Sequence, residues 1–419
     1  MNKVVIDGSV LGLGFFHEQS RTGIYRVAEN LVKGLSKGNR AEVAIASTEH
    51  LPETIAYLEK HHLNCNFPIV NKPKDIRLAS FEKKIVSSFA YKSLPQKVVR
   101  EIFTRLRAKF KPFYSFNVNT LGKHDIYHSP FLPIPKELRG ISRPTKVITI
   151  HDLIPHLFPS YFGEWNVNMM KKILDSLEDN HTYPICVSEA TKNDLCEVTG
   201  ISPDRVFVVP LAASEDKFYQ MRDNEEIECI LQKYNINIHK RYLLSIATLE
   251  PRKNIERTIR AFLKLIQQEK IEDLNLVLVG SKGWDFETIF DEIKANPVLK
   301  EKIIVTGFVA DEDLAALYSA ALAFVYPSLY EGFGLPPLEA MQCGTPVITS
   351  NKSSLPEVVE DAGLLVEPTD ENAIAEAMLQ LYADKSLRNI LSKKSSLQAQ
   401  KFSWKKFTEQ HISIYQQIS

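Results

Sequence analysis

Cysteine is scarce in this chain of 419 residues, and it contains no long hydrophobic run. Without any C-x-x-C pair, a disulfide framework or a structural zinc site is not expected, and a reducing compartment is favoured. No run approaches the ~18 apolar residues of a membrane span. Residues 1–7 are typical of a first strand rather than a signal peptide. We therefore expect a cytoplasmic protein, at most lying on the inner face of a membrane.

The chain also lacks an excess of either charge, since 51 lysines and arginines face 51 aspartates and glutamates. A general attraction to nucleic acid is therefore not expected. Apolar content of 44% and charged content of 24% are ordinary for a globular protein and exclude a disordered or fibrous one. The length suits two domains of about 200 residues each.

Short apolar runs alternate with longer amphipathic stretches, which is typical of parallel sheets covered by helices on both faces. Strands are predicted in the first half at 3–7, 42–46, 126–127, 146–150, 184–187 and 206–209. In the second half they are predicted at 242–246, 275–279, 303–306, 322–326, 346–349 and 363–366. Each series indicates a Rossmann-like unit, so the fold class is α/β.

The polar stretch 211–240 is predicted to hold the boundary between a first domain, 1–213, and a second, 214–401. The tail 402–419 has helical periodicity. A basic amphipathic insertion at 81–114 is helical in pattern, with nine lysines and arginines against two glutamates. Two interpretations of it stay open: its apolar side packs on the domain, or it lies on an anionic membrane.

The most informative segment is 331–350, EGFGLPPLEAMQCGTPVITS. Glu331 and Glu339 flank a glycine-rich turn and the start of a predicted helix, which a short apolar strand follows. A carboxylate can bind hydroxyls, and the unpaired amides of a helix start attract an anion such as a diphosphate. Eight residues are a little over two helical turns, so both carboxylates can face one cleft. This arrangement suits a nucleotide-sugar.

Two glutamates at this spacing alone would more often be unrelated surface groups, but the glycines and prolines around them add independent constraints. The segment resembles the retaining glycosyltransferases of family four. Other pieces of the family pattern stand in order along the chain: TGIYR at 22–26, DIYHSP at 125–130, HDLIP at 151–155, VSEAT at 187–191, TLEPRKN at 248–254 and VTGFV at 305–309.

The resemblance implies the GT-B fold, in which two Rossmann-like domains face a deep cleft and the last helix crosses back to the first domain. It implies that Glu331 binds hydroxyls of the donor sugar and Glu339 those of the ribose. Backbone amides would hold sugar and phosphate oxygens at Phe333, Gly334 and Leu335. Four further residues would line the nucleotide: Gly280, Ser281, Phe308 and Val309.

Departing diphosphate needs cations, and Arg252 and Lys253 follow a predicted strand where such sheets bind ligands. The alternative is a pair of solvated loop cations. The sequence departs from the commoner family pattern at Thr248, where arginine is often found, and we expect Arg252 to take over that role.

In the first domain, Gly12 and Gly14 lack the third glycine of a dinucleotide fingerprint and are predicted to form a loop facing the diphosphate. His151 follows a predicted strand, where the family has a histidine close to the reacting sugar; a surface or core histidine is the alternative. His128 is expected to be structural. The acidic run 311–313 is expected to start a helix rather than bind a metal.

We therefore expect a metal-independent retaining hexosyltransferase without a cofactor other than its nucleoside-diphosphate sugar, with GDP-mannose favoured. The acceptor would be a glycan or lipid-linked glycan in polysaccharide biosynthesis, such as O-antigen or lipopolysaccharide. One alternative is a hydrolase or phosphorylase on the same scaffold. Another is a non-catalytic nucleotide-sugar sensor or assembly partner, against which the joint presence of His151, Lys253, Glu331 and Glu339 argues.

Overall fold

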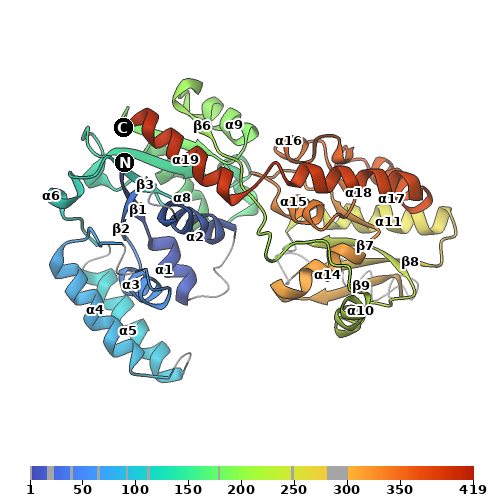
Figure 1. Cartoon of the computed structure of the whole chain (residues 1–419), viewed down its shortest axis with the longest axis horizontal. Coiled ribbons are helices and arrows are strands. Elements are labelled where there is room, and N and C mark those ends of the chain that lie inside the picture. Colours follow the sequence, from blue (N-terminus) through green and yellow to red (C-terminus); the bar gives the residue numbers. More distant parts are fainter. Residues whose placement is uncertain are drawn as a thin grey trace.

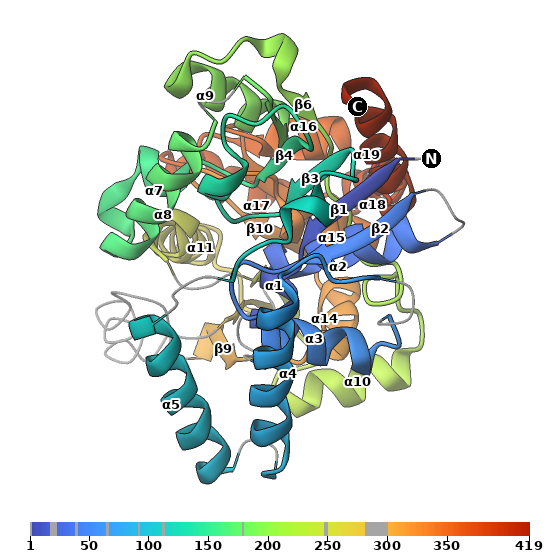
Figure 2. The same cartoon turned by 90° about the vertical axis from the view of Figure 1, so that its left-hand side faces the viewer.

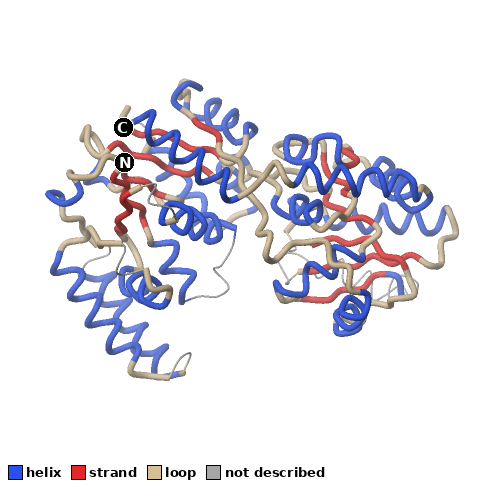
Figure 3. The backbone as a smooth tube through the Cα atoms, viewed as in Figure 1, coloured by secondary structure: helices blue, strands red, loops and turns tan. Residues whose placement is uncertain are grey.

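The computed structural model describes residues 2–16, 23–37, 41–63, 67–90, 93–110, 114–177, 180–246, 250–280 and 301–419. Two α/β halves lie side by side, each built around a sheet of six described strands (Figure 1). In each half the strands run through the middle and helices cover them on the outside (Figure 3). The α/β class predicted from the alternating pattern is confirmed.

The first sheet has the order β2-β1-β3-β4-β5-β6, and all its neighbouring strands are parallel. Its strands are β1 (Lys3–Asp7), β2 (Glu42–Ala46), β3 (Ile126–Ser129), β4 (Thr145–Ile150), β5 (Thr182–Cys186) and β6 (Phe207–Val208). The described helices of this half are α1 (Ser9–Phe16), α2 (Gly23–Ser36), α3 (Leu51–Lys60), α4 (Pro73–Ser87), α5 (Leu94–Phe110), α6 (Val118–Leu121), α7 (Ile154–Leu157), α8 (Glu164–Asp175) and α9 (Glu189–Thr199).

The second sheet has the order β12-β11-β10-β7-β8-β9 and is also parallel. Its strands are β7 (Arg241–Ile246), β8 (Leu274–Val279), β9 (Ile303–Gly307), β10 (Ala323–Tyr326), β11 (Val347–Ser350) and β12 (Gly363–Val366). The described helices here are α10 (Asn224–Lys233), α11 (Ile255–Gln268), α14 (Leu314–Ala320), α15 (Leu335–Gln342), α16 (Leu355–Val359), α17 (Glu371–Ala383) and α18 (Lys385–Ala399).

Every predicted strand is present, with its ends within two residues of the prediction. The reason is burial on both faces: all six residues of β8 are buried, and such strands are continuous apolar runs that stand out from the amphipathic helices around them.

The last helix, α19 (Trp404–Ile418), crosses back to the first half, as predicted (Figure 1). It packs on α2 so closely that a Cβ at Gly34 would lie 2.0 Å from the Thr408 hydroxyl oxygen. The Tyr415 hydroxyl lies 2.6 Å from Nδ1 of His128, whose Nε2 lies 2.8 Å from the Thr149 hydroxyl. His128 is fully buried in this network, which confirms a structural role.

The basic insertion predicted at 81–114 is two helices, α4 and α5, with a break between them and a start before residue 81. They project from the first half as a hairpin (Figure 2). Two of its arginines turn inward: Arg100 Nε lies 3.1 Å from Glu53, and an Arg107 nitrogen lies 2.9 Å from Glu82. No helix in the described part of the chain is long and apolar enough to cross a membrane.

Candidate active site

The loop from β10 to α15 carries the motif that the sequence singled out, and glycine is needed at two of its positions. Gly334 has φ +118°, a left-handed conformation that residues with a side chain rarely adopt. A Cβ on Gly332 would lie 2.0 Å from the backbone oxygen of His151, so only glycine lets the two halves approach here. The loop is therefore the place where the second half meets the end of β4 in the first.

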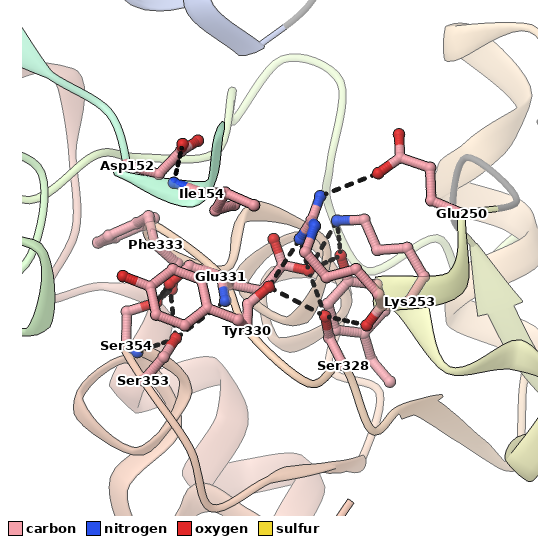
Figure 4. Close-up of polar contacts among 12 residues, drawn as sticks. Asp152, Ile154, Glu250, Lys253, Ser328, Tyr330, Glu331, Phe333, Ser353 and Ser354 are labelled. Carbon is pink, nitrogen blue, oxygen red and sulfur yellow. Dashed lines mark hydrogen bonds and ion pairs between the residues drawn. The ribbon is translucent and has the colours of Figure 1, made fainter. Parts of the chain in front are cut away.

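Glu331 is buried, and four donors converge on one of its carboxylate oxygens, Oε1 (Figure 4). The Lys253 ammonium and the Ser328 hydroxyl each lie 2.7 Å away. The Tyr326 hydroxyl lies at 2.8 Å and an Arg252 guanidinium nitrogen at 2.9 Å. Both cations stand on a short 3-10 turn after β7, Pro251–Lys253, which brings them to the carboxyl edge of the sheet.

These cations decide the charge of Glu331. Burial alone raises the pKa of its carboxyl, but Lys253 and Arg252 outweigh burial and hold that pKa at about 2. Burial lowers the pKa of Lys253, and Glu331 opposes that shift. Burial also lowers the pKa of Arg252, but the Glu331 carboxylate outweighs burial there, and the pKa of Arg252 is raised. Glu331 is thus a permanent anion at neutral pH, next to two cations in a poorly solvated site.

Two serines that the sequence interpretation missed hold this loop in place. The Ser353 hydroxyl donates to the backbone oxygen of Glu331 at 2.6 Å, and the Ser354 hydroxyl donates to that of Phe333 at 2.7 Å. Both serines lie just after β11, so hydrogen bonds from the end of a neighbouring strand hold the loop in position. Gly334 has no side chain to cap α15. Pro336 and Pro337 carry no N–H, and the Leu338 amide donates to the Gly334 backbone oxygen at 3.2 Å, so the first turn leaves the Leu335 amide for an anion.

His151 follows β4 and lies on the other side of Gly332. Its Nε2 lies 2.8 Å from the Pro130 backbone oxygen. A carbonyl oxygen only accepts, so Nε2 carries the proton and Nδ1 is an acceptor. Burial lowers the pKa of His151 to about 4, so the ring is neutral at physiological pH.

Glu339 lies on α15, and its surroundings differ from those of Glu331. An Arg26 guanidinium nitrogen lies 3.4 Å from Oε1, and the Tyr318 hydroxyl donates to Oε2 at 3.2 Å. Arg26 also pairs with Asp311 at 2.8 Å. Burial raises the pKa of Glu339 to about 7, against the pull of Arg26. Arg26 belongs to the TGIYR motif, but its contact with a residue 313 positions away needed the structure.

The prediction that Gly12 and Gly14 form a loop is wrong, because both lie inside helix α1. A Cβ on Gly12 would lie 2.5 Å from the Thr54 hydroxyl, and one on Gly14 would lie 2.2 Å from the Tyr25 ring. The two glycines therefore let α1 pack tightly against α3 and α2. A donor contact from this helix stays a prediction.

The predicted nucleotide-lining residues lie at the carboxyl ends of β8 and β9. Gly280 follows β8, and its amide donates to the Gly307 backbone oxygen at 3.1 Å. Phe308 is 78% exposed, so its ring is open to a base, while Val309 is buried. Ser281 and Thr248 lie outside the described residues.

The acidic run Asp311–Asp313 forms a 3-10 turn leading into α14, so its predicted place at a helix start is confirmed. Capping is not its role, since Asp313 makes no side-chain cap and instead binds Lys233 at 2.7 Å. Asp311 binds Lys217 at 2.8 Å besides Arg26. Within the described residues, no group of three histidines, cysteines or acids is placed to hold a metal ion.

The two halves are joined beside the site by contacts to the start of α9. The hydroxyls of Ser188 and Thr191 donate to the Gly332 backbone oxygen at 2.6 and 3.0 Å. The Glu357 carboxylate accepts the amides of Glu189 and Ala190 at 2.9 and 3.0 Å, so a side chain of the second half caps a helix of the first. These contacts fix where His151 stands relative to Glu331.

Comparison with known proteins decides the family. A model of the group 1 glycosyl transferases matches residues 226–398. O-antigen chain mannosyltransferase B from Escherichia coli is 39% identical over 293 residues, covering 70% of this chain and 74% of that one. The chain belongs to the group 1 glycosyltransferases. The family-four resemblance seen in the motifs is thereby confirmed, and the chain is an enzyme.

Other relatives of this glycosyltransferase differ in size. Serotype-specific mannosyltransferase WbdA from Escherichia coli is 34% identical over 266 residues, which make up 62% of this chain and 32% of that one. The chain thus spans about a third of WbdA. Anabaena HepE, solved in complex with UDP and glucose, covers 100% of both chains with a TM-score of 0.64 and 16% identity. This likeness shows the fold, which is GT-B.

Among the predicted catalytic residues of this glycosyltransferase, Glu331, Arg252 and Lys253 form one cluster, and the backbone oxygen of His151 lies against Gly332, the residue after Glu331. Glu339 stands apart, at the far end of the loop and helix start, in contact with α2 through Arg26. The roles assigned to these residues stay predictions.

Proposed function

We propose that this glycosyltransferase moves mannose from GDP-mannose to a hydroxyl of a glycan or lipid-linked glycan in cell-surface polysaccharide synthesis, with retention at the anomeric carbon. The mannosyltransferase names of the Escherichia coli relatives support the sugar and the pathway class. The observation that carries the site is the buried cluster in which Glu331 meets Arg252 and Lys253.

In the proposed reaction, Glu331 accepts hydroxyls of the donor sugar through its carboxylate and so positions the ring. Arg252, Lys253 and the Leu335 amide at the start of α15 stabilise the charge that develops on the diphosphate. These donors are in place before the reaction and are sheltered from water, where such stabilisation is strongest.

The proposed transfer needs no nucleophile from the protein. The bond from the anomeric carbon to the diphosphate oxygen breaks and leaves its electron pair on that oxygen. The acceptor oxygen forms the new bond on the same face of the sugar, and its proton passes to the diphosphate. His151 is neutral, and its Nδ1 can accept a hydrogen bond from a sugar hydroxyl beside this centre.

The test is calorimetric binding of GDP-mannose, UDP-glucose, UDP-N-acetylglucosamine, UDP-galactose and dTDP-rhamnose, each with and without chelator. We expect selective binding of GDP-mannose that chelator leaves unchanged and that Glu331→Gln weakens. Binding of another donor would refute the proposed sugar. Binding of a donor without transfer to any mannosylated acceptor would favour the non-catalytic sensor instead.

We also propose that the α4–α5 hairpin rests on an anionic membrane surface. Leu94, Val98, Ile102 and Leu106 follow one another at four-residue spacing on α5, and all four are exposed, Leu94 by 75%. The acids Asp75 and Glu82 are buried. Exposed charge on the two helices is therefore mostly basic, with one exposed acid, Glu101, which pairs with Arg105 at 2.8 Å. The exposed basic residues are Lys74, Arg77, Lys84, Lys97, Arg105 and Lys109. Apolar residues beside basic ones suit the headgroups of anionic lipids.

Sedimentation with vesicles of phosphatidylglycerol and phosphatidylcholine tests this surface. Replacing the exposed Lys84 and Lys97 by glutamine removes about 1 kcal/mol for each charge, so affinity should fall about 30-fold. The matched control replaces Lys385 and Lys393 on α18 by glutamine and should bind as the wild type does. Equal sedimentation of both double variants would refute the membrane surface.

A further inference from the structure

We infer that Trp165, Phe162 and Asp152 form the subsite that binds the acceptor sugar, an inference that rests on the proposed transfer. The ligand is a neutral pyranose at the end of a glycan. Nothing in the motifs pointed to these aromatic residues, which lie in or just before α8.

A cavity of about 210 Å³ lies beside His151 and is lined from both halves of the enzyme. Phe162, Trp165 and Asn166 line it from the first half, and Glu250 and Arg252 line it from the second. At about 30 Å³ per water molecule it holds the volume of roughly seven waters, which is close to that of one sugar ring. Arg252 also pairs with Glu331, so the cavity adjoins the Glu331 cluster.

Trp165 gives this cavity an aromatic wall. It is the second residue of α8 and is 64% exposed, an unusual state for the largest apolar side chain unless a partner covers it. A pyranose has apolar C–H faces and a rim of hydroxyls. An open indole beside polar groups matches both surfaces, because the ring covers one face while the polar groups bind the rim.

Asp152 supplies a polar group at the inner end. One carboxylate oxygen accepts the Ile154 amide at 2.9 Å, and the described residues offer the other oxygen no hydrogen-bond donor. Figure 4 shows Asp152 and Ile154 on the chain of the first half, next to the Glu331 loop. Burial raises the pKa of Asp152, while the charges of Arg252 and Lys253 oppose that shift. The open oxygen can accept an acceptor hydroxyl and orient it.

This placement separates the two substrates. The proposed donor groups come from the loop 327–334 and the turn at Arg252, while the proposed acceptor groups come from the end of β4 and from α8. Arg252 lines the cavity as well and so marks the boundary between the two substrates. The acceptor sugar would then approach the anomeric carbon from the first half, on the side of His151.

The test measures transfer from GDP-mannose to α-linked mannobiose carrying a fluorescent tag. Trp165→Ala should raise the acceptor KM at least tenfold, whereas Trp165→Phe keeps an aromatic face and should raise it less than threefold. Asp152→Asn should lower kcat/KM for the acceptor. Donor affinity, measured separately by calorimetry, should change less than twofold in all three variants.

The matched control is Tyr161→Ala, which removes a 43% exposed aromatic side chain that does not line the cavity, and it should transfer mannose like the wild type. An acceptor KM within twofold of wild type in Trp165→Ala, or an equal loss in Trp165→Phe, would overturn the subsite. So would a wild-type enzyme that binds GDP-mannose yet neither uses nor binds mannobiose. Failure to bind GDP-mannose would refute the proposed donor instead.

Discussion

The segment 331–339 has a buried glutamate at each end, and the two carboxyl groups have very different pKa values. Glu331 and Glu339 are each 8% exposed. The pKa of the Glu331 carboxyl is about 2, and that of the Glu339 carboxyl is about 7. Eight residues of chain thus separate a permanent anion from a group that titrates near neutral pH.

The difference comes from the cations around each carboxylate. Glu331 has Lys253 at 2.7 Å and Arg252 at 2.9 Å. Glu339 has only Arg26 within ion-pair distance among the described residues, at 3.4 Å, and Arg26 is shared with Asp311. Burial raises both pKa values, and only the closer pair of cations overcomes it. Local cation placement, rather than depth, decides which end is fixed and which end responds to pH.

The largest effect is expected when the negative charge of Glu331 is removed. Glu331→Gln keeps the shape but loses the anion, so we expect kcat to fall about 10²- to 10³-fold. It also leaves two buried cations without their shared partner, so the melting temperature should fall as well. Glu256→Gln, which removes an exposed partner of Arg260 on α11, is the control in steady-state kinetics. A kcat for Glu331→Gln within threefold of wild type would contradict the role of Glu331.

A smaller effect follows from removing one cation. Lys253→Met should lower kcat about tenfold to 100-fold by weakening stabilisation of the leaving diphosphate. It should also raise the pKa of Glu331, because a charge that lowers that pKa is gone. Activity that depends on ionised Glu331 is lost as the pH falls through its pKa, so the acid limb of the kcat profile should move to higher pH. An unmoved acid limb would show that Lys253 does not set the charge of Glu331.

The titration of Glu339 should appear as a pH dependence of donor binding. Ionised Glu339 accepts two ribose hydroxyls, whereas the protonated form accepts them less well. Donor affinity should therefore rise about tenfold as the pH increases through about 7, and this rise should be absent in Glu339→Gln. Calorimetry with GDP-mannose from pH 5.5 to 8.5 measures it. A pH dependence that persists in Glu339→Gln would assign it to another group.

The smallest expected effect comes from a substitution that lowers the pKa of Glu339 toward that of Glu331. Asp311 raises the pKa of Glu339 and competes for Arg26. Asp311→Asn should move the inflection in donor affinity to lower pH and improve binding about twofold at pH 6.5. Asp313→Asn, from the same turn but paired with Lys233, should leave the inflection unchanged. Equal shifts in both variants would contradict the proposed link through Arg26.

The sequence predicted the parts of the fold that depend on neighbours in the chain. Apolar runs such as β8 predict buried strands, and the glycines and prolines of 331–350 predict the loop and the helix start. Gly12 and Gly14 show the limit, because glycine looks the same in a loop and in a helix that packs closely on another. Only the structure revealed that the absent side chains make room for Thr54 and Tyr25.

The rest of the site depends on contacts between distant parts of the chain. Arg26 meets Glu339, and Glu357 caps α9, across separations of 313 and 168 residues. Ser353, in the turn after β11, donates a hydrogen bond to the backbone oxygen of Glu331. Serine, arginine and glutamate are common on surfaces, so their side chains carry no local signal of such contacts.

The return of α19 to the first half has a consequence for biosynthesis. His128 sits in the centre of the first sheet, and its Nδ1 pairs with Tyr415, which the ribosome adds 287 residues later. A nascent chain that stops after the first half lacks the helix whose His411 and Tyr415 pack on His128, so that ring and one face of α2 are left uncovered. The first domain cannot complete its packing until the second has been synthesised, so the nascent first half should depend on chaperones during translation.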